Sequence, residues 1–205
     1  MFLHEIMKGA DPSHLAFTGE VDVTYGALED AIHRYRNAIY ALGVREGERV
    51  SLYSANRAEF VYAFMAVVSL GAIIVPVNNS LVDREVDYIL KDSGSTLLIT
   101  DTPMDVSVPS ISIEELDEKS HEPLPEAPDF PASLTEDDIC ALIYTSGTTG
   151  SPKGAMLTHK NLVRNVEQFT ARIIFKPEDK VLCVLPMFHC YGMTTIVHGS
   201  LYAHS

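Results

Sequence analysis

Several residue types and patterns are scarce in this 205-residue sequence, and each shortage excludes a class of protein. Tryptophan is absent, and the three cysteines, Cys140, Cys183 and Cys190, are odd in number and lack CxxC spacing. Neither a disulfide framework nor a zinc site is therefore predicted. Basic residues number 15 against 28 acidic ones, and the net charge of -13 repels the phosphate backbone of nucleic acids. A nucleic-acid partner is not expected.

Long hydrophobic runs are also missing. The longest apolar stretch, residues 60–70, is shorter than the roughly 20 residues that span a bilayer. The first residues, MFLHEIMKGADP, contain acidic side chains and lack the apolar core and small-residue cleavage site of a secretory signal. We therefore expect no transmembrane segment and predict a cytoplasmic location.

The composition that remains is typical of a folded domain. Hydrophobic residues make up 46% of the chain and charged residues 21%, as in soluble globular proteins. The chain is long enough for one sizeable core. Segments with helical and strand-like patterns alternate and no internal repeat is visible, which predicts the α/β class, with helices layered on the faces of a sheet.

Two β-α-β units are predicted in residues 1–102. A first helix begins after Thr24 and ends at Gly43, with apolar residues at three- and four-residue steps. Strands are expected at residues 49–54, 73–77 and 96–100, with a buried helix over residues 60–70. Pro76 lacks a backbone donor and should lie at a sheet edge or a strand end. Another helix should end at Gly94 and bury one face, formed by Val82, Val86, Ile89 and Leu90.

Residues 103–138 are predicted to form an irregular surface connection. Six of the eleven prolines lie between Pro103 and Pro131, among many acidic residues. One short helix is expected near Glu114. We interpret this segment as joining two parts of one sheet system, residues 1–102 and 139–205.

The last part should contain two strands and one helix. A strand over residues 139–144 precedes a Gly/Ser/Thr-rich loop, and a second strand is predicted over residues 180–184. Thr158 should cap the helix, whose apolar face consists of Leu162, Val166, Phe169 and Ile173.

The loop after the first of these strands carries the most informative pattern. Residues 144–154 read YTSGTTGSPKG. Glycines let backbone amides approach an anion, hydroxyls add hydrogen bonds, and Lys153 adds a charge, so phosphate is the predicted ligand. Lys153 does not directly follow a glycine as in a Walker loop, and no GxGxxG is present. The bland alternative is an ordinary surface loop with an incidental lysine.

A second informative segment is LPMFHCYG, residues 185–192, at the end of the strand predicted over residues 180–184. Considered alone, it is most simply a turn in which His189 has a structural role, because isolated histidines seldom prove catalytic.

The segment YTSGTTGSPKGAMLTH resembles the signature of the adenylate-forming superfamily, which includes acyl- and aryl-CoA ligases, firefly-luciferase-like enzymes and peptide-synthetase adenylation domains. The segments VTYGALEDAIHRYRNAIYALGVREGERVSLYSANRAEFV and AVVSLGAIIVPVNNSL resemble the opening segments of the same family, in the same order. Nearly the whole chain is covered, and the chain most resembles the N-terminal part of a long-chain fatty acyl-CoA ligase.

The resemblance implies a reaction and a site. A carboxylic acid, best a fatty acid, attacks ATP to give an acyl-AMP and pyrophosphate, and the acyl group then passes to coenzyme A. Mg²⁺ is the implied metal, with the hydroxyl of Thr145 in its coordination shell. The residues implied to surround the β- and γ-phosphates are Thr145, Ser146, Gly147, Thr148, Thr149, Gly150 and Lys153. LPMFHCYG is similar to a motif beside the carboxylate, which makes His189 the candidate catalytic residue there, although not a general base.

The same motif favours fatty or aryl acids over amino acids, because amino-acid-activating domains carry an aspartate-containing motif in that place. Met187, Phe188 and Met193 could line part of an acyl tunnel or simply belong to the core.

The sequence also departs from the family pattern. It contains no YGxTE-type motif, no ribose-binding aspartate, no hinge and no small C-terminal domain with an adenylation lysine. We therefore expect a truncated N-terminal AMP-binding domain, inactive alone and able to self-associate through uncovered edges. The alternatives are a fragment of an aryl- or amino-acid-adenylating enzyme, and a non-catalytic module that binds a nucleotide or a partner.

Overall fold

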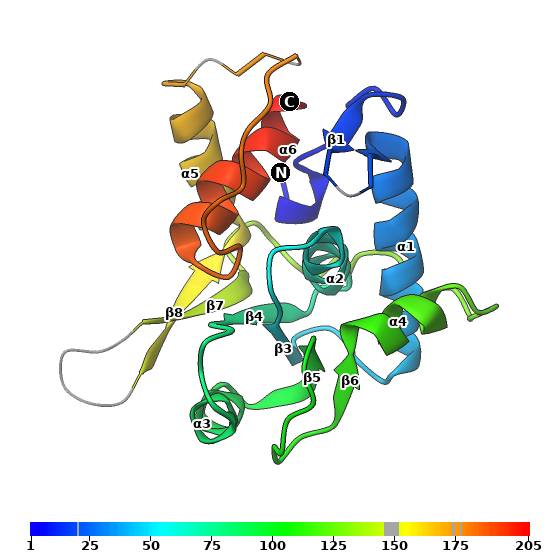
Figure 1. Cartoon of the computed structure of the whole chain (residues 1–205), viewed down its shortest axis with the longest axis vertical. Coiled ribbons are helices and arrows are strands. Elements are labelled where there is room, and N and C mark those ends of the chain that lie inside the picture. The colour runs from blue at the N-terminus through cyan, green and yellow to red at the C-terminus, as the bar shows by residue number, and fades with distance from the viewer. Residues whose placement is uncertain (20, 146–151, 174, 177) are drawn as a thin grey trace.

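A computed structural model describes residues 1–19, 21–145, 152–173, 175–176 and 178–205 of the chain. Its centre is a six-stranded sheet with the order β6-β5-β3-β4-β7-β8 (Figure 1). The strands are β3 (Arg49–Tyr53), β4 (Ile73–Val77), β5 (Ser95–Thr100), β6 (Ser110–Ser112), β7 (Ile139–Thr145) and β8 (Lys153–Thr158). All neighbours pair in parallel except β7 and β8. A separate antiparallel pair joins β1 (Leu15–Phe17) to β2 (Val23–Thr24). The predicted α/β class is confirmed.

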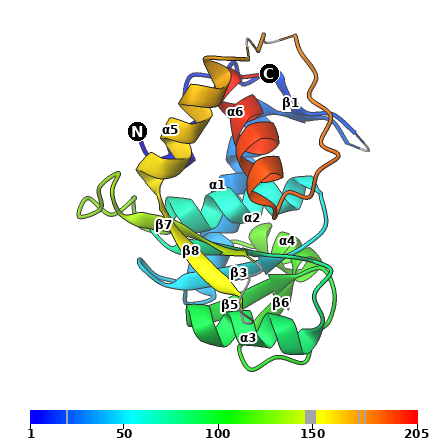
Figure 2. The same cartoon turned by 90° about the vertical axis from the view of Figure 1, so that its left-hand side faces the viewer.

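Helices cover both faces of this sheet. α3 (Asp83–Ser93) lies on one face, and α2 (Ala58–Ser69) lies on the other, beside α1 (Tyr25–Ala41) and α4 (Ile113–Ser120) (Figures 1 and 2). A further layer above α2 contains α5 (His159–Thr170), the π-helix η2 (Gly192–His198) and α6 (Gly199–Ala203), near the short 3-10 helix η1 (Leu3–Glu5). Because strand side chains alternate, Leu98 joins the core under α3, whereas Leu97 and Ile99 join the larger core under α2.

The helix boundaries follow the predicted signals. Thr24 caps α1 by accepting a hydrogen bond from the Ala27 amide at 3.2 Å, and Gly43 follows the helix with φ +99°. Gly94 ends α3 in the left-handed conformation, φ +64°. Every residue of α2 from Phe60 to Ser69 is buried, as the continuous apolar run predicted.

The strand predicted over residues 180–184 does not form. Leu182 and Val184 are 79% and 69% exposed, and within the described residues no strand pairs with this segment. An extended chain needs a backbone partner, and here the carbonyls of Cys183 and Leu185 accept hydrogen bonds from the side chain of Asn56 instead. The segment LPMFHCYG therefore follows an irregular stretch, and its predicted place at a strand end was wrong.

Smaller differences concern single residues and short strands. β6 and β8 were not predicted. In the proline-rich stretch, α4 is the short helix expected near Glu114, and β6 is an additional strand. Val82 is the exposed residue that precedes α3, and Ile173 lies beyond the end of α5, so neither lines the predicted helix face. Pro76 lies in the interior strand β4 and not at a sheet edge, but it is near the end of that strand. The register between β4 and β7 contains Ile74 and does not extend to Pro76.

Candidate functional site

The carboxyl end of β7 and the start of β8 bring two predicted site residues together. Thr145, the last residue of β7, is directly opposite Lys153, the first residue of β8, in the antiparallel register. Both side chains are exposed. Ser146, Gly147, Thr148, Thr149 and Gly150 lie outside the described residues.

The paired strands are anchored to α3 by Tyr144. Its hydroxyl donates a hydrogen bond of 2.6 Å to Oδ2 of Asp92, and the hydroxyl of Tyr88 reaches the carbonyl of Pro152 at 3.4 Å. Burial and the Asp92 carboxylate raise the pKa of Tyr144, so this hydroxyl stays a donor. The ring lies over Gly154, where a Cβ would be 3.1 Å from two ring carbons. A glycine is therefore favoured at this position.

The chemistry of this pair suits an oxyanion. A lysine ammonium and a threonine hydroxyl side by side offer a charge and a polar donor. Among the described residues, no carboxylate forms a salt bridge with Lys153. The carboxyl ends of parallel strands are also where open α/β sheets bind their ligands.

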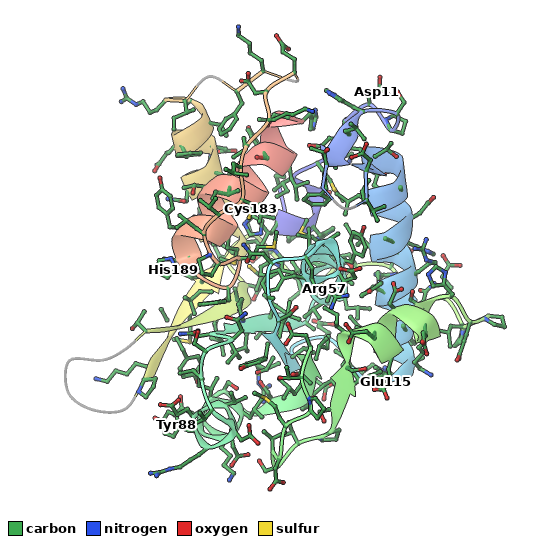
Figure 3. All side chains as sticks on the ribbon, viewed as in Figure 1. Asp11, Arg57, Tyr88, Glu115, Cys183 and His189 are labelled. Atoms are coloured by element: carbon green, nitrogen blue, oxygen red, sulfur yellow. The ribbon has the colours of Figure 1, made fainter. Side chains whose placement is uncertain are left out.

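His189 lies on the side of the molecule from which the β7–β8 pair projects (Figure 3). Its backbone amide donates to the carbonyl of Pro186 at 3.1 Å, and its Nδ1 accepts a hydrogen bond from the Tyr191 amide at 3.3 Å. Because Nδ1 is an acceptor, the neutral ring carries its proton on Nε2. His189 is exposed, and its Nε2–H can therefore donate a hydrogen bond to an acid.

Two methionines fix the ends of the His189 turn in the main core. Met187 and Met193 are 6% and 1% exposed, and the partly buried Phe188 packs against the same core. All three side chains belong to the core that also contains α2. Burial supports membership of the core, and Met187 in addition lines the mainly apolar cavity described below, so the structure does not choose between the two interpretations.

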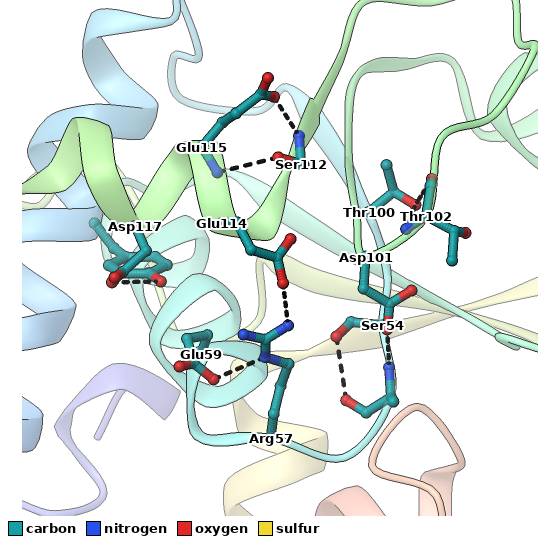
Figure 4. A network of polar contacts seen from close by, with 12 residues as sticks. Ser54, Arg57, Glu59, Thr100, Asp101, Thr102, Ser112, Glu114, Glu115 and Asp117 are labelled. Atoms are coloured by element: carbon teal, nitrogen blue, oxygen red, sulfur yellow. Dashed lines mark hydrogen bonds and ion pairs between the residues drawn. The ribbon is translucent and has the colours of Figure 1, made fainter.

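The loop between β3 and α2 contributes a residue that the sequence reasoning did not select. Asn56 holds the chain just before His189 through both groups of its side-chain amide. The loop is itself held in place: the amide of Ala55 donates to Oδ2 of Asp101 at 2.7 Å, and Arg57 forms ion pairs with Glu59 and Glu114 at 2.8 and 2.6 Å (Figure 4). The signal for Asn56 was its position in the loop that follows a buried parallel strand.

A cavity of about 650 Å³ includes Met187 in its wall. It is lined by β1 and residues 178–183 and is mainly apolar, with Leu15, Phe17, Val181 and Val197 among its walls. Thr145, Lys153 and His189 do not line it. Within the described parts of the chain, no group of three or more His, Cys, Asp or Glu side chains could hold a metal ion, and no helix is long and apolar enough to cross a membrane.

Comparison with known proteins identifies related sequences. A family model described as AMP-binding enzyme matches residues 7–204. A feruloyl-CoA synthase from Amycolatopsis is 34% identical over 201 residues, covering 91% of this chain and 40% of that protein. The long-chain-fatty-acid–CoA ligase FadD13 from Mycobacterium tuberculosis is 32% identical over 194 residues, covering 89% and 39%. The chain thus spans about two fifths of the length of these relatives.

Solved structures show the same fold. The inhibitor-bound N-terminal domain of FACL13 from Mycobacterium tuberculosis matches with a TM-score of 0.87 and 29% identity, covering 99% of this chain and 55% of that one. ATP-bound MatB from Rhodopseudomonas palustris matches with a TM-score of 0.88 and 25% identity, covering 100% of this chain and 44% of that one. An o-succinylbenzoate-CoA synthetase, MenE from Bacillus subtilis, in complex with AMP matches with 0.86 and 30%, covering 98% and 52%.

Proposed function

This chain belongs to the AMP-binding enzyme family, and on this premise we propose that it forms the phosphate-binding and carboxylate-binding part of an ATP-dependent fatty acid–CoA ligase. The related ligases differ in their acids, which include feruloyl and long-chain fatty substrates. The LPMFHCYG segment favours fatty or aryl acids over amino acids, and a fatty acid is the first choice because a long-chain-fatty-acid–CoA ligase is among the relatives. An aryl acid is the second, favoured by the feruloyl-CoA synthase relative.

The proposed reaction has two steps at one site. The acid carboxylate forms a bond to the α-phosphorus of ATP, and the bond from that phosphorus to the β-phosphate oxygen breaks, releasing pyrophosphate. The thiol of coenzyme A then loses its proton to solvent, its sulfur bonds to the acyl carbon, and the bond from that carbon to the AMP oxygen breaks. Both steps move negative charge between phosphate oxygens and carbonyl oxygens, so fixed positive groups lower their barriers.

Three residues of this chain receive roles in that reaction. The ammonium of Lys153 neutralises the β- and γ-phosphates, and the Nε2–H of His189 orients the acid by donating to its carboxylate. The exposed Thr145 hydroxyl, beside Lys153, fits a hard cation that prefers oxygen ligands. Mg²⁺ held there would supply additional positive charge to the phosphates.

One observation carries the proposal: Thr145 and Lys153 are registered opposite each other at the carboxyl edge of the sheet. If they bind the polyphosphate tail, the chain should bind ATP, tripolyphosphate should compete, and AMP should compete poorly. Lys153→Met should weaken ATP binding by about tenfold, the equivalent of one charge-assisted hydrogen bond.

Lys160→Met is the matched control, because Lys160 is also exposed but pairs with Asp137 at 2.9 Å. Titration calorimetry at fixed salt measures the affinities for ATP, tripolyphosphate and AMP. Equal ATP affinities of the two variants would remove Lys153 from the site. An AMP affinity equal to that of ATP would argue against a polyphosphate site.

The 205-residue chain alone is proposed to lack ligase turnover. A pyrophosphate-release assay with ATP, Mg²⁺ and a fatty acid should give no rate above background, and clear turnover would contradict this. A non-catalytic nucleotide-binding module predicts the same result. Acid-dependent ATP–pyrophosphate exchange by a longer protein that contains this chain separates the two, and comparing fatty, aryl and amino acids there selects the substrate.

A further inference from the structure

Asn56 binds the main chain before His189 through both polar groups of its side chain. Its Nδ2 donates to the carbonyl oxygen of Leu185 at 2.8 Å and reaches that of Cys183 at 3.4 Å. Its Oδ1 accepts a hydrogen bond from the amide of Met187 at 2.8 Å. The side-chain amide therefore bonds to the peptide groups on both sides of Pro186, as the backbone of a neighbouring strand would.

The segment that Asn56 holds has few other backbone partners. Between residues 181 and 188, the described residues show one further backbone hydrogen bond donated within the segment, from the amide of Val184 to the carbonyl of Leu182 at 3.1 Å. Pro186 has no amide hydrogen to donate. An exposed stretch without a strand partner is free to change its path, so the Asn56 contacts and the buried Met187 side chain define its position.

The loop that presents Asn56 is fixed from both sides. Before it, the amide of Ala55 is bound by Asp101 at the end of β5. After it, Arg57 joins Glu59 in α2 to Glu114 in α4 (Figure 4). Asn56 can thus transmit the position of the parallel sheet to the segment that precedes His189.

His189 follows this anchor by two residues. Its amide bonds to the carbonyl of Pro186, the residue between the two peptide groups held by Asn56. The orientation of the ring is then set by the hydrogen bond from the Tyr191 amide to Nδ1. A shift of residues 185–187 would move both the turn and the imidazole.

We propose that Asn56 is a positioning residue, which holds the His189 imidazole at the carboxylate-binding position by fixing the main chain on both sides of Pro186. Its role is to hold the main chain and not to react. The part of this inference that concerns the acid rests on the proposed function, whereas the part that concerns the orientation of His189 does not.

Asn56→Asp is the informative variant. It keeps the shape and the acceptor for the Met187 amide, but it removes both donated hydrogen bonds and turns a negative charge toward the Leu185 carbonyl oxygen. Asn37→Asp is the matched control, because the Oδ1 of Asn37 also accepts a distant backbone amide, that of Ala127 at 2.9 Å, and Asn37 lies on α1. Asn56→Gln keeps donor and acceptor on a longer arm and should restore part of the effect.

The readout is the ¹⁵N NMR signal of the His189 imidazole in the 205-residue chain. In the parent, the shifts should be those of a ring protonated on Nε2. In Asn56→Asp, they should move toward a mixture of the two tautomers, while Asn37→Asp leaves them unchanged. Unchanged His189 shifts in Asn56→Asp, with the chain still folded, would overturn the positioning role.

Addition of octanoate in the presence of ATP tests the link to the acid. The parent Nε2 signal should shift on addition, and Asn56→Asp should need about tenfold more octanoate, the effect of losing about one hydrogen bond. If the Nε2 signal of the parent does not shift on addition of octanoate, the proposed contact between His189 and the carboxylate is contradicted. The tautomer measurement still decides whether Asn56 orients His189. If both proteins respond at the same concentration, Asn56 does not position His189 for the acid.

Discussion

The β7–β8 pair and the segment before His189 support the same proposed site by different means. The β7–β8 pair has a continuous backbone register from Ala141 to Thr145, and Tyr144 ties it to α3. Residues 180–188 have no strand partner among the described residues and are held by one asparagine side chain and one buried methionine.

This difference indicates how substitutions will act in each region. A strand pair shares its stability over many backbone hydrogen bonds, so the loss of one side-chain contact changes it little. A segment held at few points depends on each of them. Substitutions near His189 should therefore cost more than comparable substitutions in the β7–β8 pair.

The largest contrast is expected from two glycines. In Gly192→Ala, the new Cβ would overlap the carbonyl oxygen of Pro186, a backbone atom that already accepts the His189 amide. In Gly154→Ala, the Cβ would be 3.1 Å from the Tyr144 ring, which can shift slightly. We expect losses in the free energy of unfolding of about 3 kcal/mol for Gly192→Ala and about 1 kcal/mol or less for Gly154→Ala. Urea unfolding measures both, and equal losses would remove the contrast.

Substitution of two buried histidines should change the free energy of unfolding by smaller amounts and in opposite directions. His159 begins α5 directly after β8, and its Nδ1 accepts the Leu3 amide at 3.1 Å. His198 ends η2, and its buried Nδ1 has no partner among the described residues. At pH 7, His198→Leu should raise the free energy of unfolding by about 1 kcal/mol, because an unpaired polar group is removed, and His159→Leu should lower it by a similar amount. Losses in both variants would contradict this interpretation.

The pH dependence of stability tests the same pair. Burial lowers the pKa of His198 to about 3 and that of His159 to about 4. The unfolded chain binds these protons first, so the folded state loses stability as the pH falls below the unfolded pKa near 6.5. Each histidine should lower the free energy of unfolding by about 1.5 kcal/mol as the pH falls from 6.5 to 5. Either leucine variant should show a shallower dependence over this range in urea unfolding.

The smallest effect is expected at Tyr144. Tyr144→Phe removes the 2.6 Å hydrogen bond to Asp92 but keeps the ring over Gly154, and the exposed carboxylate can bind water instead. The expected loss in the free energy of unfolding is about 0.5 kcal/mol. Tyr88→Phe is the control, because its bond to Pro152 is longer, at 3.4 Å. A larger loss for Tyr88→Phe would mean that Tyr144 does not anchor the pair.

The sequence predicted those elements whose signals are local. Local residues determine the helix boundaries at Thr24, which caps α1, and at Gly43 and Gly94, which are left-handed. The continuous apolar run determines the burial of α2. Pairing of distant segments was less visible: β6 forms only three registered pairs with β5, within a stretch rich in proline and acid.

Residues 180–184 show why apolar alternation alone misleads. Lys180 to Val184 has the composition of a strand, but a strand also requires a neighbouring strand for its backbone hydrogen bonds, and the apolar pattern does not identify one. Thr145, Lys153 and His189 were found because they stand in recognisable motifs. Asn56 was not, because its role depends on a contact with Met187, 131 residues away along the chain.

The burial of α2 from Phe60 to Ser69 determines whether parts of the molecule can fold separately. Its side chains contact the sheet below, and Phe64 meets the His198 ring of the upper layer at 5.2 Å. Removing either the sheet or the upper helices would expose an apolar surface on α2 to water. Proteolytic dissection should therefore yield no stable half of the molecule, and both layers should melt in a single cooperative transition.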